Sequence, residues 1–317
     1  MSDVRTSERA WKALAPRQQP RRRLNSTRRC RVRAQPNTSR VGEHNHQAWF
    51  LPREHGATAM LLTPIVCTAI LARTWRWSEL ATLTAAFAAL AAKDPMVVLV
   101  RQRFVWKQRH PETAVAARWL AGWSVILVAS GLVLLTAWPL KAMVAMGLGV
   151  GVFSALAVAV NMKNRQRSTL FQIASAAALT SSSLATSLSA TGAIAPWCWW
   201  LWLLMAMQAA AGILVVHARL DARIAVRVAS SATAPVREDF RRVAQISLIV
   251  LICAAVTAIV LRRGFVALAL LVAVVGYGYD LRRQRSTAAL QIPLTKVGQR
   301  ALALASLFAS LLILGLW

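Results

Sequence analysis

Apolar stretches of membrane length, separated by short polar segments, occupy most of the chain from residue 57 onward. A window of about twenty apolar residues matches the hydrocarbon thickness of a bilayer, so each such window predicts a transmembrane helix. The nine predicted spans are residues 57–72, 79–100, 119–138, 140–160, 169–189, 197–217, 243–261, 264–281 and 300–317. The pattern therefore predicts an all-α polytopic transmembrane helix bundle with about nine spans.

Small residues concentrate in three of these windows. The window 79–100 is rich in alanine, 140–160 carries three closely spaced glycines, and 169–189 combines alanine with serine. Small side chains allow helix backbones to approach closely in a membrane. We therefore expect a compact bundle rather than a loose set of anchors.

The first 48 residues have a different pattern. They are polar and contain arginine runs such as Arg21-Arg22-Arg23, interrupted by prolines. A segment with so little apolar surface to bury is expected to be disordered. The sequence thus predicts a basic disordered N-terminal tail over residues 1–48 and a transmembrane helical domain over residues 49–317.

Composition and charge support a membrane protein over a nucleic-acid-binding protein. Of the 317 residues, 57% are hydrophobic and 15% are charged, whereas a soluble domain has about 25% charged residues. The net charge of +27 could suggest nucleic acid, but the basic residues form short runs between the apolar windows, as membrane topology requires. The four cysteines are scattered without a CxxC pair, so neither a disulfide framework nor a zinc site is predicted.

The distribution of lysine and arginine predicts the orientation. Outside the tail, 19 of these residues flank the spans on the side of the N-terminus, and 5 lie on the other side. Basic loops stay in the cytoplasm, so we expect a multi-pass protein of the cell membrane with its N-terminus inside. An odd number of spans then places Trp317 outside, where other tryptophans also gather, as expected for an interfacial residue.

The first predicted span begins with an unusual polar stretch, Arg53-Glu54-His55-Gly56. One interpretation is an interfacial anchor, in which Arg53 reaches for lipid phosphates and Glu54 favours a helix N-terminus. The other is that Glu54 and His55 face a polar site between helices, since ionisable groups within membrane spans usually serve a function. Both interpretations stay open at this point.

Further polar residues gather near the predicted cytoplasmic side of later spans. Lys93-Asp94-Pro95 lies inside the second span, where it forms either part of a site or an ion pair with another helix. Asn161 ends the fourth span and shares a helix face with Asn164, next to arginines that also fit an ordinary stop signal.

The sixth predicted span ends with two interleaved pairs at four-residue spacing. His217 shares a helix face with Asp221, and Arg219 shares one with Arg223. Two arginine forks at this spacing can hold a phosphate or diphosphate, although an interfacial Asp–Arg network is an equal explanation. The end of the eighth span, Tyr277 to Arg283, is explained by aromatic anchors and basic residues alone.

Taken together, these positions predict a substrate-binding site that faces the cytoplasm. Its candidate residues are Glu54, His55, Asp94, Asn161, His217, Arg219, Asp221 and Arg223. The chain has no Walker loop, HExxH, GxSxG or dinucleotide-binding glycine motif. No catalytic residue or metal ligand is therefore predicted, and whether the protein is an enzyme stays open.

The stretch from Pro52 to Met60, Pro-Arg-Glu-His-Gly-Ala-Thr-Ala-Met, resembles the opening of the first helix in the YwiC-like family of bacterial membrane proteins. Looser similarities are Asp94-Pro95, Asn161 with Arg165 and Arg167, and Arg219 with Arg223. The resemblance extends over roughly residues 52–317, but only the first motif is specific. The chain departs from the family pattern at Thr58, where an aromatic residue is common, and in its long tail.

The nine-helix layout, with polar clusters at the cytoplasmic ends of helices two, four and six, also looks like the UbiA-type prenyltransferase fold, a fold-level analogy. Enzymes of that type hold Mg²⁺ and a prenyl diphosphate with two aspartate-rich segments. The corresponding places here offer only Asp94 and Asp221, so Mg²⁺ is expected only if the protein is prenyltransferase-like, and arginines would have to neutralise most of the diphosphate.

Two functions from different classes follow. The first is an integral membrane protein that binds an isoprenoid or lipid diphosphate in a cytoplasm-facing pocket, with the bilayer and that ligand as partners and no nucleic acid. The alternative is a non-catalytic membrane protein, either a small-solute transporter or an assembly factor. Broken helices in corresponding halves of the chain would favour transport.

Overall fold

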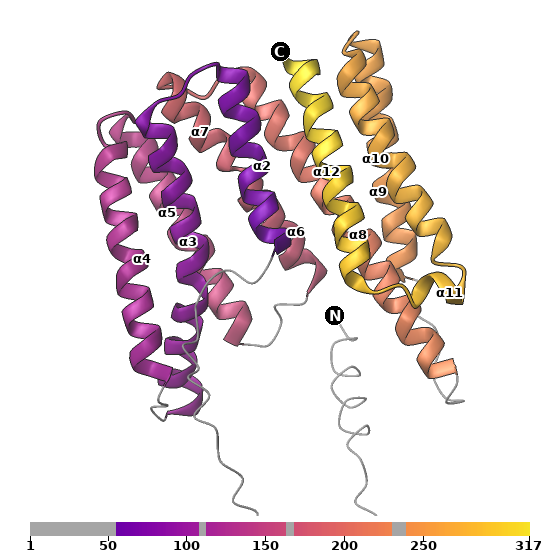
Figure 1. The fold of residues 1–317 in the computed structure, drawn as a ribbon, viewed down its shortest axis with the longest axis horizontal. Coiled ribbons are helices and arrows are strands. Elements are labelled where there is room, and N and C mark those ends of the chain that lie inside the picture. The colour runs from indigo at the N-terminus through magenta and orange to yellow at the C-terminus, as the bar shows by residue number, and fades with distance from the viewer. Residues whose placement is uncertain (1–54, 108–111, 163–167, 230–238) are drawn as a thin grey trace, which may run out of the picture. The chain divides into compact units, whose positions relative to one another are not determined.

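The computed structural model describes residues 55–107, 112–162, 168–229 and 239–317 (Figure 1). The predicted disordered tail lies outside these residues, as does Glu54. All regular structure within the described residues is helical. The helices are α2 (His55–Ala72), α3 (Trp77–Arg101), η1 (Gln102–Trp106, a π-helix), α4 (Glu112–Leu134), α5 (Leu140–Met162), α6 (Thr169–Thr180), α7 (Ser182–Thr191), α8 (Pro196–Ala229), α9 (Asp239–Val260), α10 (Gly264–Arg283), α11 (Thr287–Leu290) and α12 (Leu294–Leu316).

The all-α polytopic architecture expected from the apolar windows is confirmed. Seven of the described helices are long and apolar enough to cross a membrane: α3, α4, α5, α8, α9, α10 and α12. The first window forms a shorter apolar helix, Gly56–Ala72. The window 169–189 forms two helices, because α6 ends at Thr180 and α7 begins at Ser182. The count of nine spans and the inside–outside assignment stay predictions.

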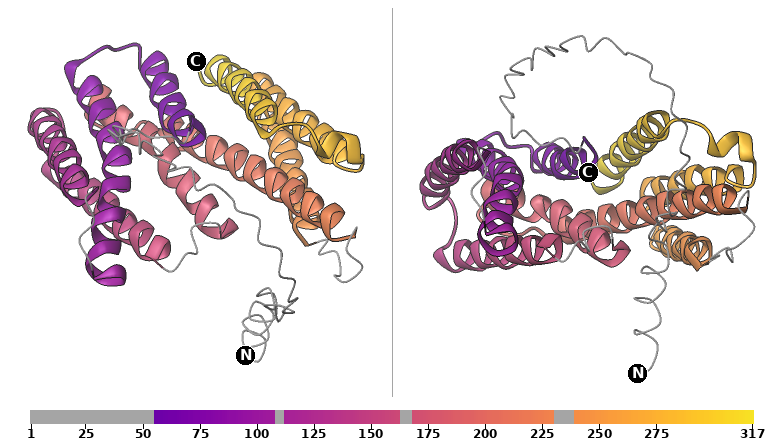
Figure 2. Two further views of the ribbon diagram at one scale, coloured as in Figure 1. Left: turned by 60° about the horizontal axis from the view of Figure 1, so that its bottom comes forward. Right: turned by 90° about the horizontal axis from the view of Figure 1, so that it is seen from below.

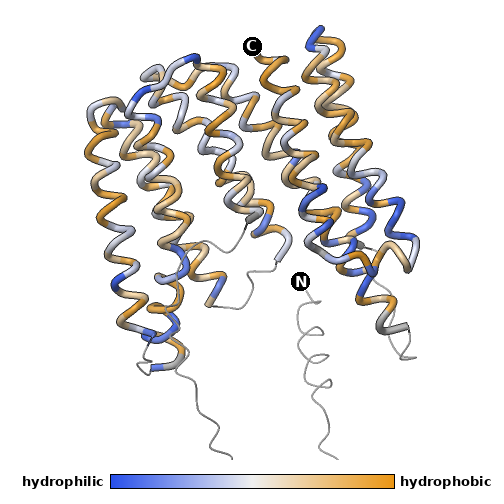
Figure 3. Tube along the Cα trace, viewed as in Figure 1, coloured by the Kyte–Doolittle hydropathy of each residue, from blue (hydrophilic) through white to orange (hydrophobic). Residues whose placement is uncertain are grey.

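Successive helices run in alternating directions between two ends of the helical unit, with α6 and α7 together making one passage (Figure 1). Hydrophilic residues gather at the end that holds α11 and the beginning of α12, while the middle of most helices is hydrophobic (Figure 3). At the other end, the guanidinium of Arg73 lies 4.0 Å from the ring centre of Trp317. The end of α2 and the end of α12 therefore lie together.

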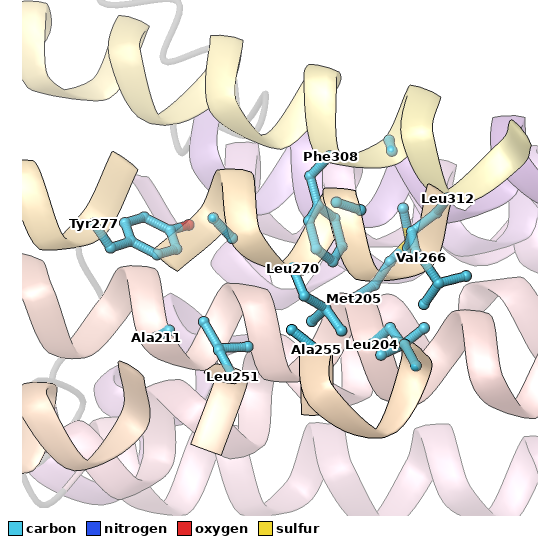
Figure 4. Packing of buried hydrophobic residues seen from close by; sticks show 14 of the residues in the cluster. Leu204, Met205, Ala211, Leu251, Ala255, Val266, Leu270, Tyr277, Phe308 and Leu312 are labelled. Atoms are coloured by element: carbon cyan, nitrogen blue, oxygen red, sulfur yellow. The ribbon is translucent and has the colours of Figure 1, made fainter. Parts of the chain in front are cut away.

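The C-terminal helices α8, α9, α10 and α12 surround an apolar core (Figure 4). Leu201, Leu251, Leu270 and Leu312 are fully buried, and Phe308 is 1% exposed. Two glycines permit close helix contacts here. A Cβ at Gly212 would lie 2.8 Å from the hydroxyl of Tyr277, and one at Gly276 would lie 2.8 Å from Leu304. The large side chains Tyr277 and Leu304 thus pack directly against the two glycines and bring their helices close together.

The N-terminal helices α2, α3 and α7 meet through hydrogen bonds of serine and threonine hydroxyl groups. We call these residues the hydroxyl seam; they are Ser78, Thr82, Ser182 and Ser189. Ser78 donates to the Ser189 carbonyl at 2.8 Å, and Thr82 shares a hydrogen bond with the Ser189 hydroxyl. Ser182 donates to the carbonyl of Leu61 on α2 at 3.0 Å. All four side chains are buried. The helix α2 packs against α7 of this half and also against α12, so it joins the two halves (Figure 2).

Candidate functional site

The first candidates from the sequence are only partly within the described structure. Glu54 and the side chain of His55 lie outside it, although His55 begins α2. Asp94 lies on α3, where its Oδ1 is 3.9 Å from Nζ of the neighbouring Lys93. The side chains of Lys93 and Asp94 are 30% and 44% exposed, and an ion pair this accessible contributes little to stability.

Asn161 lies where the end of α5 meets α3. Its backbone carbonyl accepts a hydrogen bond from Nη2 of Arg101 at 2.9 Å. The side-chain oxygen Oδ1 of Asn161 is buried and has no hydrogen-bond partner in the described structure. Asn161 is therefore a helix-connecting residue with one unused acceptor.

His217 connects three helices. Its Nε2 lies 2.9 Å from Oε1 of Gln172 on α6, and its ring stacks on Phe240 of α9 with ring centres 5.4 Å apart. Asp221 is half-buried one turn further along α8. These contacts place His217 in the packing between α6, α8 and α9.

Arg219 and Arg223 hold the segment between α10 and α12, and we call this pair the arginine clamp. Arg219, which is 4% exposed, donates from Nη2 to the carbonyls of Ala289 at 2.6 Å and Ile292 at 3.3 Å. Arg223 donates to the carbonyls of Leu290 at 2.6 Å and of Ile292. These are the carbonyls at the end of the short helix α11, where a cation is favourable.

The clamp gives the two arginines a structural role that spacing alone does not reveal. Their shared helix face is as the sequence predicts, but their hydrogen-bond partners are backbone carbonyls some 70 residues away. Phosphate binding by these two side chains stays a prediction. The described contacts also place Asp94, Asn161, His217 and the clamp in different local settings.

A groove of about 540 Å³ lies beside the clamp, and we call it the basic groove. Its lining residues are Arg282, Arg283, Arg285, Ser286, Ala288, Ala289 and Ile292. It forms because α10 ends at Arg283 and the chain turns sharply into α11. Gln284 is buried and donates from Nε2 to the Val215 carbonyl at 3.1 Å. This contact fixes the turn, while Arg282 and Arg285 on either side of Gln284 are exposed.

The electrostatics of the groove are dominated by arginine. The guanidinium of Arg283 lies 5.6 Å from the ring centre of Tyr279, within cation–π range. Asp280 interacts electrostatically with Arg219, Arg283 and Arg300, and thus offsets part of the positive charge. The sequence interpretation missed this groove because it explained the end of the eighth span as an anchor. The signal was the continuation Arg282-Arg283-Gln284-Arg285-Ser286, with three arginines and a serine in five residues.

A magnesium site would need several side chains with oxygen ligands close together. In the part of the chain that the structure describes, no three His, Cys, Asp or Glu side chains form a group able to hold a metal ion. Mg²⁺ bound to a diphosphate still needs several oxygen ligands. The described residues therefore do not fit Mg²⁺.

The comparison with known families bears on the N-terminal half of the helical unit. Residues 51–187 match the family described as YwiC-like protein. We call residues 51–187 the YwiC-like region, after the family that they match. The YwiC-like region contains the Pro52–Met60 motif and covers α2 to the first part of α7, whereas the arginine clamp and the basic groove lie beyond it. No curated protein and no solved structure matches the chain. Together with the apolar helices, the match identifies a multi-pass helical membrane protein with a YwiC-like region.

Proposed function

We propose that this protein binds the phosphate or diphosphate head group of an isoprenoid or lipid in the basic groove, at the predicted cytoplasmic face of the cell membrane. The observation that carries the proposal is the lining of the groove, with three arginines and one serine. Planar guanidinium groups bind phosphate oxygens in pairs, and a serine hydroxyl adds a further donor.

The same lining favours a lipid-linked phosphate over a water-soluble one. Ala288, Ala289 and Ile292 form the apolar part of the groove, next to the arginines. A head group at the arginines would leave an attached chain against this apolar part and the adjoining helices. The clamp supports this arrangement, because it fixes the carbonyls of α11 and so holds the apolar part in position.

The proposal is one of binding, without a chemical step. The lining supplies guanidinium groups and a serine hydroxyl, and the carboxylate of Asp280 interacts with Arg283 of the lining. Prenyl transfer in the manner of UbiA-type enzymes would need a metal site that the described residues do not form. Head-group recognition needs only the cations.

Binding can be measured on the full-length protein in detergent, with geranyl diphosphate and inorganic diphosphate as probes. The double variant Arg282→Gln/Arg285→Gln should weaken geranyl diphosphate binding by about tenfold or more, the effect of losing about 1.4 kcal/mol of charge-assisted hydrogen bonding. The matched control is Arg262→Gln/Arg263→Gln, two exposed arginines between α9 and α10. Equal loss in both double variants would contradict the proposal. If inorganic diphosphate bound with the same affinity as geranyl diphosphate, the lipid chain would contribute nothing to binding.

Small-solute transport is a second candidate, because one observation favours it. The break between α6 and α7 lies against α2 near its internal Pro64, where Ser182 bonds to Leu61. Discontinuous helices line substrate sites in many transporters, although both irregular helices here lie in the same half of the chain. Alternating access would make a Ser182→Cys variant react with membrane-impermeant thiol reagents from either side of sealed vesicles. Reaction from one side only, or no reaction, would contradict transport through this seam.

A further inference from the structure

A notch of about 280 Å³ opens on one face of α4, far along the chain from the basic groove. Its lining is Arg118, Trp119, Gly122, Trp123 and Ile126, which recur at spacings that place them on one helix face. Gly122 forms the floor, since a Cβ at this position would have no other atom within 4 Å. The notch exists because a glycine stands where its neighbours carry large side chains. We refer to it as the α4 notch.

Aromatic rings give the notch its walls. The rings of Trp119 and Trp123 stack with centres 6.2 Å apart and an angle of 27° between their planes. Phe87 of α3 meets Trp123 edge-on at 5.9 Å, and this contact holds the indole against the neighbouring helix. The indole Nε1 of Trp123 is buried without a hydrogen-bond partner in the described structure. Phe87 of α3 therefore holds the Trp123 ring in place, and the notch between the lining residues stays open.

The surroundings of the notch indicate the chemistry of its occupant. The helix α4 is long and apolar enough to cross a membrane, and side chains such as Val125 and Leu132 are more than 60% exposed, at 68% and 61%. Arg118 is exposed at the end of the notch that lies toward the start of α4, the predicted cytoplasmic side. Along the helix, the lining thus passes from a cation to aromatic and aliphatic groups.

We propose that the α4 notch binds one anionic glycerophospholipid, with an acyl chain over Gly122 and the phosphate at Arg118. The order of the lining matches the order of the lipid, head group first and hydrocarbon second. Arginine near a helix end reaches for lipid phosphates, and tryptophan is a preferred residue at the membrane interface. The site is independent of the proposed function, since the basic groove is formed by α10 and α11.

Native mass spectrometry of the full-length protein, transferred from mixed phosphatidylglycerol and phosphatidylcholine bilayers, tests the site. Gly122→Leu puts an apolar side chain into the notch, where a Cβ would have no other atom within 4 Å. Leucine is also a better helix former than glycine, so the fold should be kept. The matched control is Gly147→Leu on α5, another exposed glycine with open space around it. The expected result is one fewer retained phosphatidylglycerol in Gly122→Leu and an unchanged number in Gly147→Leu.

Arg118→Gln separates the two parts of the site. This variant should keep the chain-binding surface but lose about tenfold of the preference for phosphatidylglycerol over phosphatidylcholine, as expected for loss of one charge-assisted contact. Unchanged lipid retention in Gly122→Leu would overturn the proposal. A dimer that is present in the wild type and absent in Gly122→Leu would also overturn it, because a second copy would then occupy the notch.

Discussion

The two halves of the helical unit are held together by different interactions. The N-terminal half, α2 to α7, contains the YwiC-like region, and we call it the YwiC-like half. In it, α2, α3 and α7 meet through the hydroxyl seam, with Ser189 at its centre. In the C-terminal half, α8, α9, α10 and α12 meet through an apolar core that contains Phe308 and four fully buried leucines. The family match ends within α7, close to where the seam ends.

The difference shows two solutions to one problem. Inside a bilayer, helix association gains nothing from removing apolar groups from water, so it relies on close packing and on hydrogen bonds between helices. The apolar core of the C-terminal half is an example of close packing, and the hydroxyl seam of the YwiC-like half is an example of hydrogen bonds between short side chains. Because packed large side chains leave cavities when truncated, whereas hydroxyl bonds are individually weak, the two halves should respond to mutation on different scales.

The largest expected effect is in the apolar core. Phe308 is 1% exposed between α12 and its neighbours, so Phe308→Ala would leave a cavity. We expect it to lower the free energy of unfolding in mixed micelles by about 3–5 kcal/mol. The control is Leu314→Ala on the same helix, where the side chain is 56% exposed and the effect should be small. Equal destabilisation by both variants would show that packing does not dominate this half.

The arginine clamp should give the second largest effect. Arg219→Met keeps an unbranched apolar stem but lacks the guanidinium, so the carbonyls of Ala289 and Ile292 lose their donor. Loss of a hydrogen bond from a charged group lowers stability by about 1.5–3 kcal/mol. The loss should be local, so trypsin should cut the variant faster after the exposed Arg285 than the wild type.

Arg300→Met serves as the control for the clamp, since Arg300 is an exposed arginine on α12, whereas Arg219 and Arg223 of α8 donate to the carbonyls of α11. Cleavage after Arg285 at the wild-type rate in Arg219→Met would mean that the clamp does not hold this segment. Comparison with Arg223→Met would show whether the two arginines act together.

The sequence predicts the helices well because bilayer thickness fixes the length of an apolar window. Each of the nine windows corresponds to helical structure. The helix break at Ser181, between α6 and α7, is not predicted by the sequence. Residues 174–183 are alanine and serine apart from Leu179 and Thr180, without proline or glycine, so the pattern predicts one helix. The hydrogen bond from Ser182 to Leu61 depends on a residue 121 positions away, which no local pattern contains.

The site illustrates the same limit. The spacing of Arg219 and Arg223 places them on one helix face, and the structure uses that face to bind α11. Identifying carbonyls as the partners requires knowing that the chain folds back after Arg283. The basic groove depends on the same turn, since α11 brings Ala288, Ala289 and Ile292 beside the arginines at the end of α10.

The centre of the hydroxyl seam should give a moderate effect. The Ser189 hydroxyl accepts a hydrogen bond from Nε1 of Trp138 at 2.7 Å and pairs with Thr82. We expect Ser189→Ala to lower the free energy of unfolding by about 1 kcal/mol, because hydroxyl hydrogen bonds between membrane helices contribute about 0.6 kcal/mol on average and at most about 1.7 kcal/mol. The control is Ser310→Ala, an exposed serine that bonds within its own helix. A loss as large as that of Phe308→Ala would remove the contrast between the halves.

The smallest expected effect isolates a single hydroxyl pair in the YwiC-like half. Thr84 on α3 and Ser130 on α4 share a hydrogen bond of 2.9 Å at the partly buried contact between these helices. A double-mutant cycle with Thr84→Ala and Ser130→Ala should give a coupling energy of about 0.6 kcal/mol, the average for such pairs between membrane helices. Thr84 also bonds the carbonyls of Leu80 and Ala81 in its own helix. A coupling energy above about 2 kcal/mol would exceed the range for such pairs. It would mean that single hydroxyl bonds stabilise this half as strongly as packing stabilises the other.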